Sequence, residues 1–143
     1  MSSEKKHVLL SIKPQYAKLI VIGLKTIELR TKVPELHNGD TLAFYESSPV
    51  KMVTFIAEVD KVIVAKPELL WEQYHESLGL SKQVYDDYFY NREFAYGIQL
   101  RSVTKIQPIS LSSICGEATN APQSFRYLSS HEYQMIEHLA IHE

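Results

Sequence analysis

The sequence predicts an α+β fold in which a twisted or barrel-like sheet carries a few helices at its rim. Three observations lead to this class. Several segments have the apolar, β-branched composition of strands. Helical patterns are confined to short stretches, and they do not alternate with the strands as they would in a parallel βαβ fold.

The first strand is expected at residues 7–12, where HVLLSI forms an apolar run. A short helix follows it, because Pro14 suits the first turn of a helix and the apolar side chains after it have helical spacing. Gly23 is expected to end this helix, since glycine readily adopts the left-handed conformation that a helix end often needs.

The next strand, at 25–31, has alternating side chains. Ile27 and Leu29 lie on one face, and Glu28 and Arg30 lie on the other together with a threonine. The alternation therefore places two apolar side chains toward a core and an oppositely charged pair on the other side of the strand.

Three further strands complete the expected sheet. An Asn-Gly-Asp turn at 38–40 leads into a strand that contains Leu42 and Phe44. Residues 51–65 form one bent strand or two, and 94–106 form the last clear strand.

Helices are expected between the last two strands and at the end of the chain. In the helical section 67–91, Pro67 begins one helix, Gly79 ends it and Ser81 caps a second.

The last part of the chain, 110–143, is predicted to be a loop followed by a helix. Residues 111–129 have a loop-like composition with a short helical turn at 111–114, and a helix capped by Ser130 covers 130–142.

The length, composition and net charge limit the class of protein. The 143 residues correspond to a single domain, 1–143, with an ordinary hydrophobic fraction of 45%. The net charge of −2 excludes binding of nucleic acid by the whole surface, so any such site must be a local patch. The only cysteine, Cys115, excludes an intrachain disulfide. Without a signal peptide or a long apolar run, we expect a cytoplasmic protein that does not span a membrane.

The stretch that follows the first strand resembles the signature of the ASCH domain family, a branch of the PUA-like superfamily. The pattern comprises Gly23, Lys25, Glu28 and Arg30 after a short helix. Further resemblance covers 38–47, 94–100 and 121–129, and leaves 67–91 as a variable helical insert. The resemblance implies a PUA-like small β-barrel with helices packed around a cleft. It also implies binding of RNA or nucleotides, with a regulatory role in transcription or translation.

Some members of this family resemble amidohydrolases that remove the acetyl group from acetylcytidine. Lys25 matches their proposed catalytic lysine, whereas Glu28 stands where they have a threonine. Their helical glutamate has no single counterpart here, because Asp86, Asp87 and Glu93 are all candidates.

The charged residues of the signature have more than one interpretation. Lys25 is a nucleophile or base if a cleft lowers its pKa, a phosphate contact if it stays charged, or a solvated turn lysine. Glu28 and Arg30 form a cleft-side ion pair that orients Arg30 toward a phosphate or base, or a plain salt bridge on the surface. Lys13 adds a phosphate contact at the helix N-terminus, or is a solvated lysine at a strand end.

A second group of candidate ligand contacts lies near the end of the chain. Gln123 and Ser124 have groups that read a base edge, Phe125 can stack on a base, and Arg126 can meet a phosphate. In the alternative interpretation, one aromatic ring of this segment fills the core. Tyr45 is expected to line the cleft from its strand.

No metal site or cofactor is expected. His138 and His142 lie one turn apart, but no third ligand follows at a suitable spacing. The sequence has no glycine-rich phosphate loop and no dinucleotide fingerprint.

Three functions follow from these residues. The first is a module that binds RNA, single-stranded nucleic acid or a modified nucleoside. The second is an enzyme of the same fold, in which Lys25 and Glu28 act on acetylcytidine or a related nucleoside, or cleave RNA. The third is a protein–protein adaptor that uses the helices of 67–91 as its interface.

Overall fold

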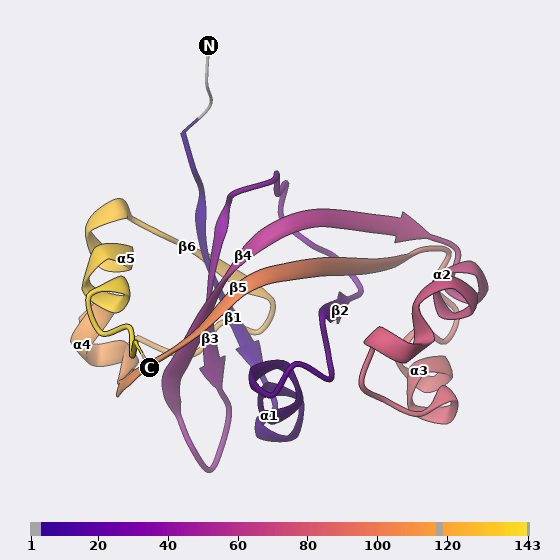
Figure 1. Ribbon diagram of the computed structural model, residues 1–143, viewed down its shortest axis with the longest axis horizontal. Helices are drawn as coiled ribbons and strands as arrows, with labels where there is room; N and C mark the ends of the chain where they lie inside the picture. The colour runs from indigo at the N-terminus through magenta and orange to yellow at the C-terminus, as the bar shows by residue number, and fades with distance from the viewer. Residues whose placement is uncertain (1–3, 117–118, 143) are drawn as a thin grey trace.

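A computed structural model describes residues 4–116 and 119–142 and shows one six-stranded sheet with helices at both ends and below its middle (Figure 1). The strands are β1 (His7–Ile12), β2 (Ile27–Arg30), β3 (Thr41–Glu46), β4 (Met52–Ala65), β5 (Ala95–Ile109) and β6 (Phe125–Leu128). The helices are α1 (Pro14–Val21), α2 (Pro67–Tyr74), α3 (Lys82–Tyr88), α4 (Leu111–Cys115) and α5 (Ser130–Glu137), and a 3₁₀ turn, η1, covers His75–Ser77. This arrangement confirms the α+β class.

The sheet is mixed and has the strand order β2-β5-β4-β3-β1-β6. The first and third strands run parallel, and every other described pair is antiparallel. The segment expected as one bent strand or two is a single strand, β4, whose pairing with β5 shifts register at several points. Such irregularities bend a ladder and increase its twist.

The sheet is not closed, so the expectation of a barrel is wrong. Within the described residues, β2 pairs with β5 at one edge and β6 pairs with β1 at the other, and no ladder joins the two edges. The β2 strand has four residues, and the side chain of Arg30 extends from its end to the backbone of Ser11 and Ser124. The Arg30 side chain therefore spans the space between the two edges of the sheet, which would be joined by strand pairing in a closed barrel.

Three apolar clusters hold the helices to the sheet. The first lies between the sheet and α1, the second beneath α4 and α5, and the third between α2, α3 and the ends of β2 and β5. In Figure 1, α1 accordingly lies below the middle of the sheet, with α4 and α5 at one end and α2 and α3 at the other. The third cluster matters most for the site, because it places α3 beside β2.

The end of the chain differs from its predicted form. Residues expected to form a loop contain the strand β6, although 117–118 of that segment lie outside the described residues. The strand forms because β1 supplies an antiparallel partner far away in the sequence. The last helix ends at Glu137 rather than at 142, and its N-cap is Ser129, not Ser130. Ser129 accepts a hydrogen bond from the Glu132 backbone N–H, while the Glu132 carboxylate accepts one from the Ser129 N–H.

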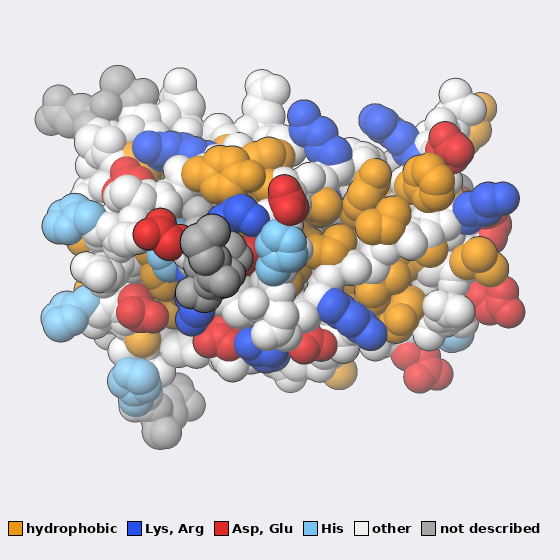
Figure 2. All heavy atoms as spheres, turned by 90° about the horizontal axis from the view of Figure 1, so that it is seen from above, with side chains coloured by type: hydrophobic (Ala, Val, Ile, Leu, Met, Phe, Trp, Pro, Cys, Tyr) orange, Lys and Arg blue, Asp and Glu red, His pale blue; other side chains and the backbone are white. Residues whose placement is uncertain are grey.

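The surface carries no extended field of a single sign on the side seen in Figure 2. Among the described residues of that face, acidic and basic side chains are interspersed with apolar ones. This distribution agrees with the small net charge of −2. Binding of an anion is therefore expected at a local site and not across the whole surface.

Candidate functional site

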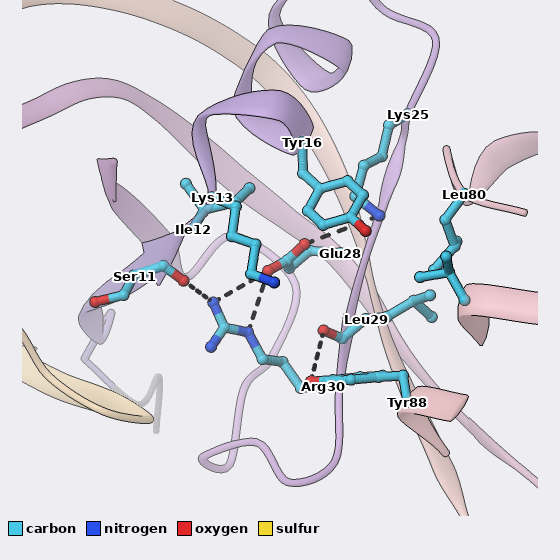
Figure 3. A pocket seen from close by; sticks show the side chains of 11 residues that line it. Ser11, Ile12, Lys13, Tyr16, Lys25, Glu28, Leu29, Arg30, Leu80 and Tyr88 are labelled. Atoms are coloured by element: carbon cyan, nitrogen blue, oxygen red, sulfur yellow. Dashed lines mark hydrogen bonds and ion pairs between the residues drawn. The ribbon is translucent and has the colours of Figure 1, made fainter. Parts of the chain in front are cut away.

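A cleft of about 220 Å³ lies between the end of β1, the helix α1, the strand β2 and the helix α3 (Figure 3). Its lining comprises Ser11, Ile12, Lys13, Tyr16, Lys25, Glu28, Leu29, Arg30, Leu80, Val84 and Tyr88. The charged residues of the signature thus share one cavity with several apolar side chains. A few polar groups among apolar walls are typical of a site for a small ligand or a single base.

Lys25 reaches the cleft because the helix before it ends at a glycine. Gly23 has a φ of 88°, and the chain then turns so that the Lys25 N–H donates to the Leu19 carbonyl oxygen at 3.1 Å. The Lys25 side chain is only 3% exposed. Its Nζ donates a hydrogen bond to the Leu78 carbonyl oxygen at 2.6 Å and lies 5.5 Å from the centroid of the Tyr16 ring. A solvated turn lysine is therefore the wrong interpretation of Lys25.

Glu28 and Arg30 form an ion pair within the cleft. The Glu28 Oε2 atom accepts from Arg30 Nε at 3.1 Å and lies 3.0 Å from Arg30 Nη2. The two side chains are 8% and 13% exposed. The pair is therefore buried, and it is not the surface salt bridge that the sequence left open.

Arg30 also contacts backbone atoms on the other edge of the sheet. Its Nη2 donates to the Ser11 carbonyl oxygen, and its Nη1 donates to the Ser124 carbonyl oxygen at 3.4 Å. The guanidinium plane is thus held by Glu28 on one side and by two strand ends on the other. A guanidinium held in this way is pre-organised for binding an anion.

Burial controls the electrostatics of the cleft. It lowers the pKa of Lys25, an effect that the nearby Arg30 increases and the Glu28 carboxylate opposes. Burial also raises the pKa of Tyr88, whose hydroxyl donates to the Leu29 carbonyl oxygen at 3.4 Å. The cleft thus combines a lysine whose pKa is lowered, a buried carboxylate 3.9 Å from the lysine Nζ, and a fixed guanidinium. Together these groups can bind an anion or transfer a proton.

The structure brings together only part of the predicted site. Lys13, at the N-terminus of α1, lines the cleft with Lys25, Glu28 and Arg30. Ser124 meets Arg30 through its backbone carbonyl.

The other predicted ligand contacts lie outside the cleft lining. Tyr45, which was expected to line the cleft, packs against the second apolar cluster. Phe125 packs against the first, as the alternative interpretation for the rings of its segment allowed. Gln123 is exposed, and Arg126 lies 3.5 Å from Glu132 on α5.

The walls supplied by α3 were missed in the sequence. Tyr88 is 43% exposed and lines the cleft with Val84. These two residues are four positions apart, a spacing that places them on one face of a helix. Two of the three acids that could have completed an amidohydrolase site, Asp86 and Asp87, bond to other residues of α3. Asp86 accepts from Lys82 and Asp87 from Gln83, both on the exposed surface of α3.

The chain belongs to the ASCH domain family, whose profile matches residues 10–107. An ASCH domain-containing ribonuclease of Zymomonas mobilis is 33% identical to it over 135 residues, which cover 93% of this chain and 91% of that protein. The crystal structure of ASCH from the same organism covers 96% of this chain and 98% of its own, with 32% identity and a TM-score of 0.89. The family assignment thus rests on both the sequence and the fold.

Further structures extend this comparison. Two single-residue variants of the Zymomonas protein, one with a tyrosine replaced by phenylalanine and one with a serine replaced by alanine, each have a TM-score of 0.88. The N-terminal domain of McrB from Staphylothermus marinus, at 15% identity and a TM-score of 0.61, covers 95% of both chains and shows a shared fold alone.

No described helix has both the length and the apolar character needed to cross a membrane. No group of three metal-binding side chains is found within 4–116 and 119–142.

Proposed function

We propose that this protein binds single-stranded RNA at the cleft between α1, β2 and α3 and cleaves it. The observation that carries this proposal is the 33% identity to an ASCH domain-containing ribonuclease along 91% of that protein. Similarity over nearly the whole length of both chains makes a shared activity the simplest expectation, although a fold alone would not.

The charges of the cleft support RNA as the ligand. Three basic side chains, Lys13, Lys25 and Arg30, line it against one carboxylate, that of Glu28. Lys13 is exposed, so it is free to meet a phosphate, while Arg30 offers a fixed guanidinium. The aromatic rings of Tyr16 and Tyr88 provide surfaces on which a base can stack.

Two hydroxyl residues outside the cleft lining, Tyr45 and Ser124, are candidates for a role in cleavage. RNA strand scission needs a group that takes the proton of the 2′-hydroxyl and a group that protonates the leaving oxygen. Tyr45 on β3 lies opposite Ser11 on β1, and Ser124 directly precedes β6, which pairs with β1. The backbones of both residues therefore lie beside β1, whose Ser11 carbonyl oxygen Arg30 contacts, and Arg30 contacts the Ser124 carbonyl oxygen as well. The tyrosine and serine variants of the Zymomonas protein remove hydroxyls of the same two types.

The proposal is tested by cleavage of a labelled single-stranded RNA. Tyr45→Phe should reduce the rate by about a hundredfold or more if its hydroxyl transfers a proton, and Ser124→Ala should slow cleavage if its hydroxyl binds the substrate. Tyr127→Phe and Ser130→Ala are matched controls, because both residues are exposed and lie outside the cleft lining, and they should cleave at the wild-type rate. Absence of cleavage by the wild-type protein would refute the proposal.

A second candidate is an amidohydrolase that acts on acetylcytidine or a related nucleoside. The observation that favours it is the buried Lys25, whose Nζ lies 3.9 Å from the Glu28 Oε1 atom in the enclosed cleft. A desolvated lysine beside a carboxylate has the features of a nucleophile with its proton acceptor. Release of acetate from acetylcytidine by the wild type, and its loss in Lys25→Met, would support this activity. Intact acetylcytidine after incubation with the wild type would rule it out.

A further inference from the structure

The segment from α2 to α3, residues 67–88, forms one wall of the cleft. Leu80, Val84 and Tyr88 line the cavity from this side, facing α1 and β2 across it. The segment connects the ends of β4 and β5, and its own apolar cluster includes Leu78 and Tyr85. The width of the cleft therefore depends on how the segment is held against β2.

Two hydrogen bonds join the residues before β2 to this segment. The Lys25 Nζ donates to the Leu78 carbonyl oxygen at 2.6 Å, and the Thr26 N–H donates to the Ser77 carbonyl oxygen at 3.0 Å. Lys25 is itself held to α1, because its N–H donates to the Leu19 carbonyl oxygen. Lys25 therefore links the helix on one side of the cleft to the segment on the other.

Gly79 provides the surface on which the Lys25 side chain rests. A Cβ atom at position 79 would lie 2.9 Å from Lys25 Cβ, 3.1 Å from Cδ and 3.2 Å from Cγ. These atoms belong to the stem of the lysine, which the buried surroundings prevent from moving away freely. Gly79 also has a φ of 71°, which favours glycine. It directly follows Leu78, so the same turn supplies both the close contact and the hydrogen-bond acceptor.

The bond from Lys25 does not depend on its charge. Burial lowers the pKa of Lys25, yet a neutral amine still has N–H groups to donate to the Leu78 carbonyl oxygen. Leaving the buried carbonyl and amine without hydrogen-bond partners would cost free energy. The hydrogen bond between Lys25 and Leu78 is therefore favoured in either protonation state of the lysine.

We propose that Lys25 is a positioning residue that clamps the α2–α3 segment against β2, with Gly79 as its contact surface, and so sets the width of the cleft. The effect of this clamp on RNA cleavage rests on the proposed function, whereas the clamp itself does not. Lys25 then acts on the ligand through the wall formed by Leu80, Val84 and Tyr88, and not by attacking it.

A pair of glycine substitutions tests the clamp without changing Lys25. Gly79→Ala and Gly39→Ala carry the same kind of backbone penalty, since the two φ angles are 71° and 91°. A Cβ at Gly39 makes only an ordinary contact, 3.9 Å from Lys5 Cε, whereas one at Gly79 collides with Lys25. Amide hydrogen exchange within 77–88 should accelerate by about fivefold to tenfold in Gly79→Ala relative to Gly39→Ala, as expected for loss of one or two hydrogen bonds.

Kinetics on the same pair separate positioning from catalysis. If the full-length protein cleaves RNA, Gly79→Ala should raise KM by about fivefold to tenfold and change kcat little, because the wall moves while the reacting groups stay. Lys25→Met, which keeps an apolar stem but removes the amine, should show the same pattern. Lys18→Met, on the exposed side of α1, is its control and should behave as the wild type.

Several outcomes would decide the matter. Equal exchange rates within 77–88 in Gly79→Ala and Gly39→Ala would overturn the clamp. It would also be overturned if Lys25→Met abolished kcat and left exchange and KM unchanged, since Lys25 would then be a catalytic residue. If Gly79→Ala fails to fold, the comparison of Lys25→Met with Lys18→Met carries the same test. A wild type that cleaves no RNA but shows the exchange difference would refute the proposed function and support the clamp.

Discussion

Replacing Arg30 by methionine should lower the free energy of unfolding by up to about 3–5 kcal/mol, because the buried Glu28 carboxylate loses its nearer partner and keeps only Lys25, whose Nζ lies 3.9 Å from Oε1. Methionine keeps much of the apolar stem of arginine, so the change falls mainly on the polar contacts. In the native protein the guanidinium meets Glu28, Ser11 and Ser124, and its side chain is 13% exposed. Without it, the Glu28 carboxylate remains in a site where it is 8% exposed.

The magnitude follows from burial. A pair of the same geometry on the surface contributes about 0–1 kcal/mol, because water already solvates both charges. The protein contains such a pair for comparison: Arg101 Nε lies 3.0 Å from Glu58 Oε2, and the two side chains are 40% and 37% exposed. Arg101→Met should therefore cost no more than about 1 kcal/mol.

Urea denaturation of four proteins measures the effect. They are the wild type, Arg30→Met, Glu28→Gln and the double variant. The double variant should be more stable than Arg30→Met, because it no longer buries a carboxylate that has lost its nearer partner. The reasoning is refuted if Arg30→Met costs less than about 1 kcal/mol, as Arg101→Met should, or if the two single effects simply add.

Three more predictions concern stability. Ser129→Ala should lower the free energy of unfolding by about 1 kcal/mol through loss of the capping box, while Ser130→Ala should have little effect; equal losses in thermal or urea unfolding would contradict this. Gly97→Ala should destabilise by about 1–3 kcal/mol in the same assay, because its Cβ would lie 2.8 Å from the Ile27 Cγ2 atom; an unchanged urea midpoint would disprove the contact. Burial raises the pKa of Tyr85 and of Tyr133 from 10.0 to about 12, so the unfolded state loses these protons first as the pH rises. The stability that each contributes, about 2–3 kcal/mol, should be complete below pH 10 and disappear between pH 10 and 12, and urea curves that do not change over that interval would argue against it.

Local patterns predicted the faces of β2 correctly. Ile27 and Leu29 are core residues, and Glu28 and Arg30 lie on the other side of the strand, as the alternation requires. The signature spacing also brought Lys25 to the same cleft. These features depend on the two-residue period of a strand and on one glycine turn, both of which can be recognised within a few residues.

Strand β6 and the open sheet could not be predicted in this way. The four residues FRYL form a strand because β1 pairs with them, and that partner lies more than a hundred positions away in the sequence. Closure of the sheet likewise depends on whether β2 and β6 meet at their edges. The side chain of Arg30 reaches across that interval, and no local pattern distinguishes this bridge from a ladder.

The walls of the cleft depend on tertiary contacts as well. Val84 and Tyr88 share a helix face, but the sequence does not say what that face meets. The structure places it opposite β2, where Lys25 and Thr26 bond to the α2–α3 segment. The aromatic candidates Tyr45 and Phe125 were drawn from composition, and burial in two different apolar clusters sets them apart from the cleft lining.

Cleavage of single-stranded RNA by Lys13→Glu and Lys18→Glu tests the location of the site most directly. Both lysines are exposed and belong to α1 or its N-terminus, but only Lys13 lines the cleft. If RNA is bound and cleaved there, Lys13→Glu should cleave at least about tenfold more slowly at low salt, and Lys18→Glu should stay close to the wild type. Equal rates in the two variants, or intact RNA with the wild type, would contradict the assignment of this cleft as a ribonuclease site.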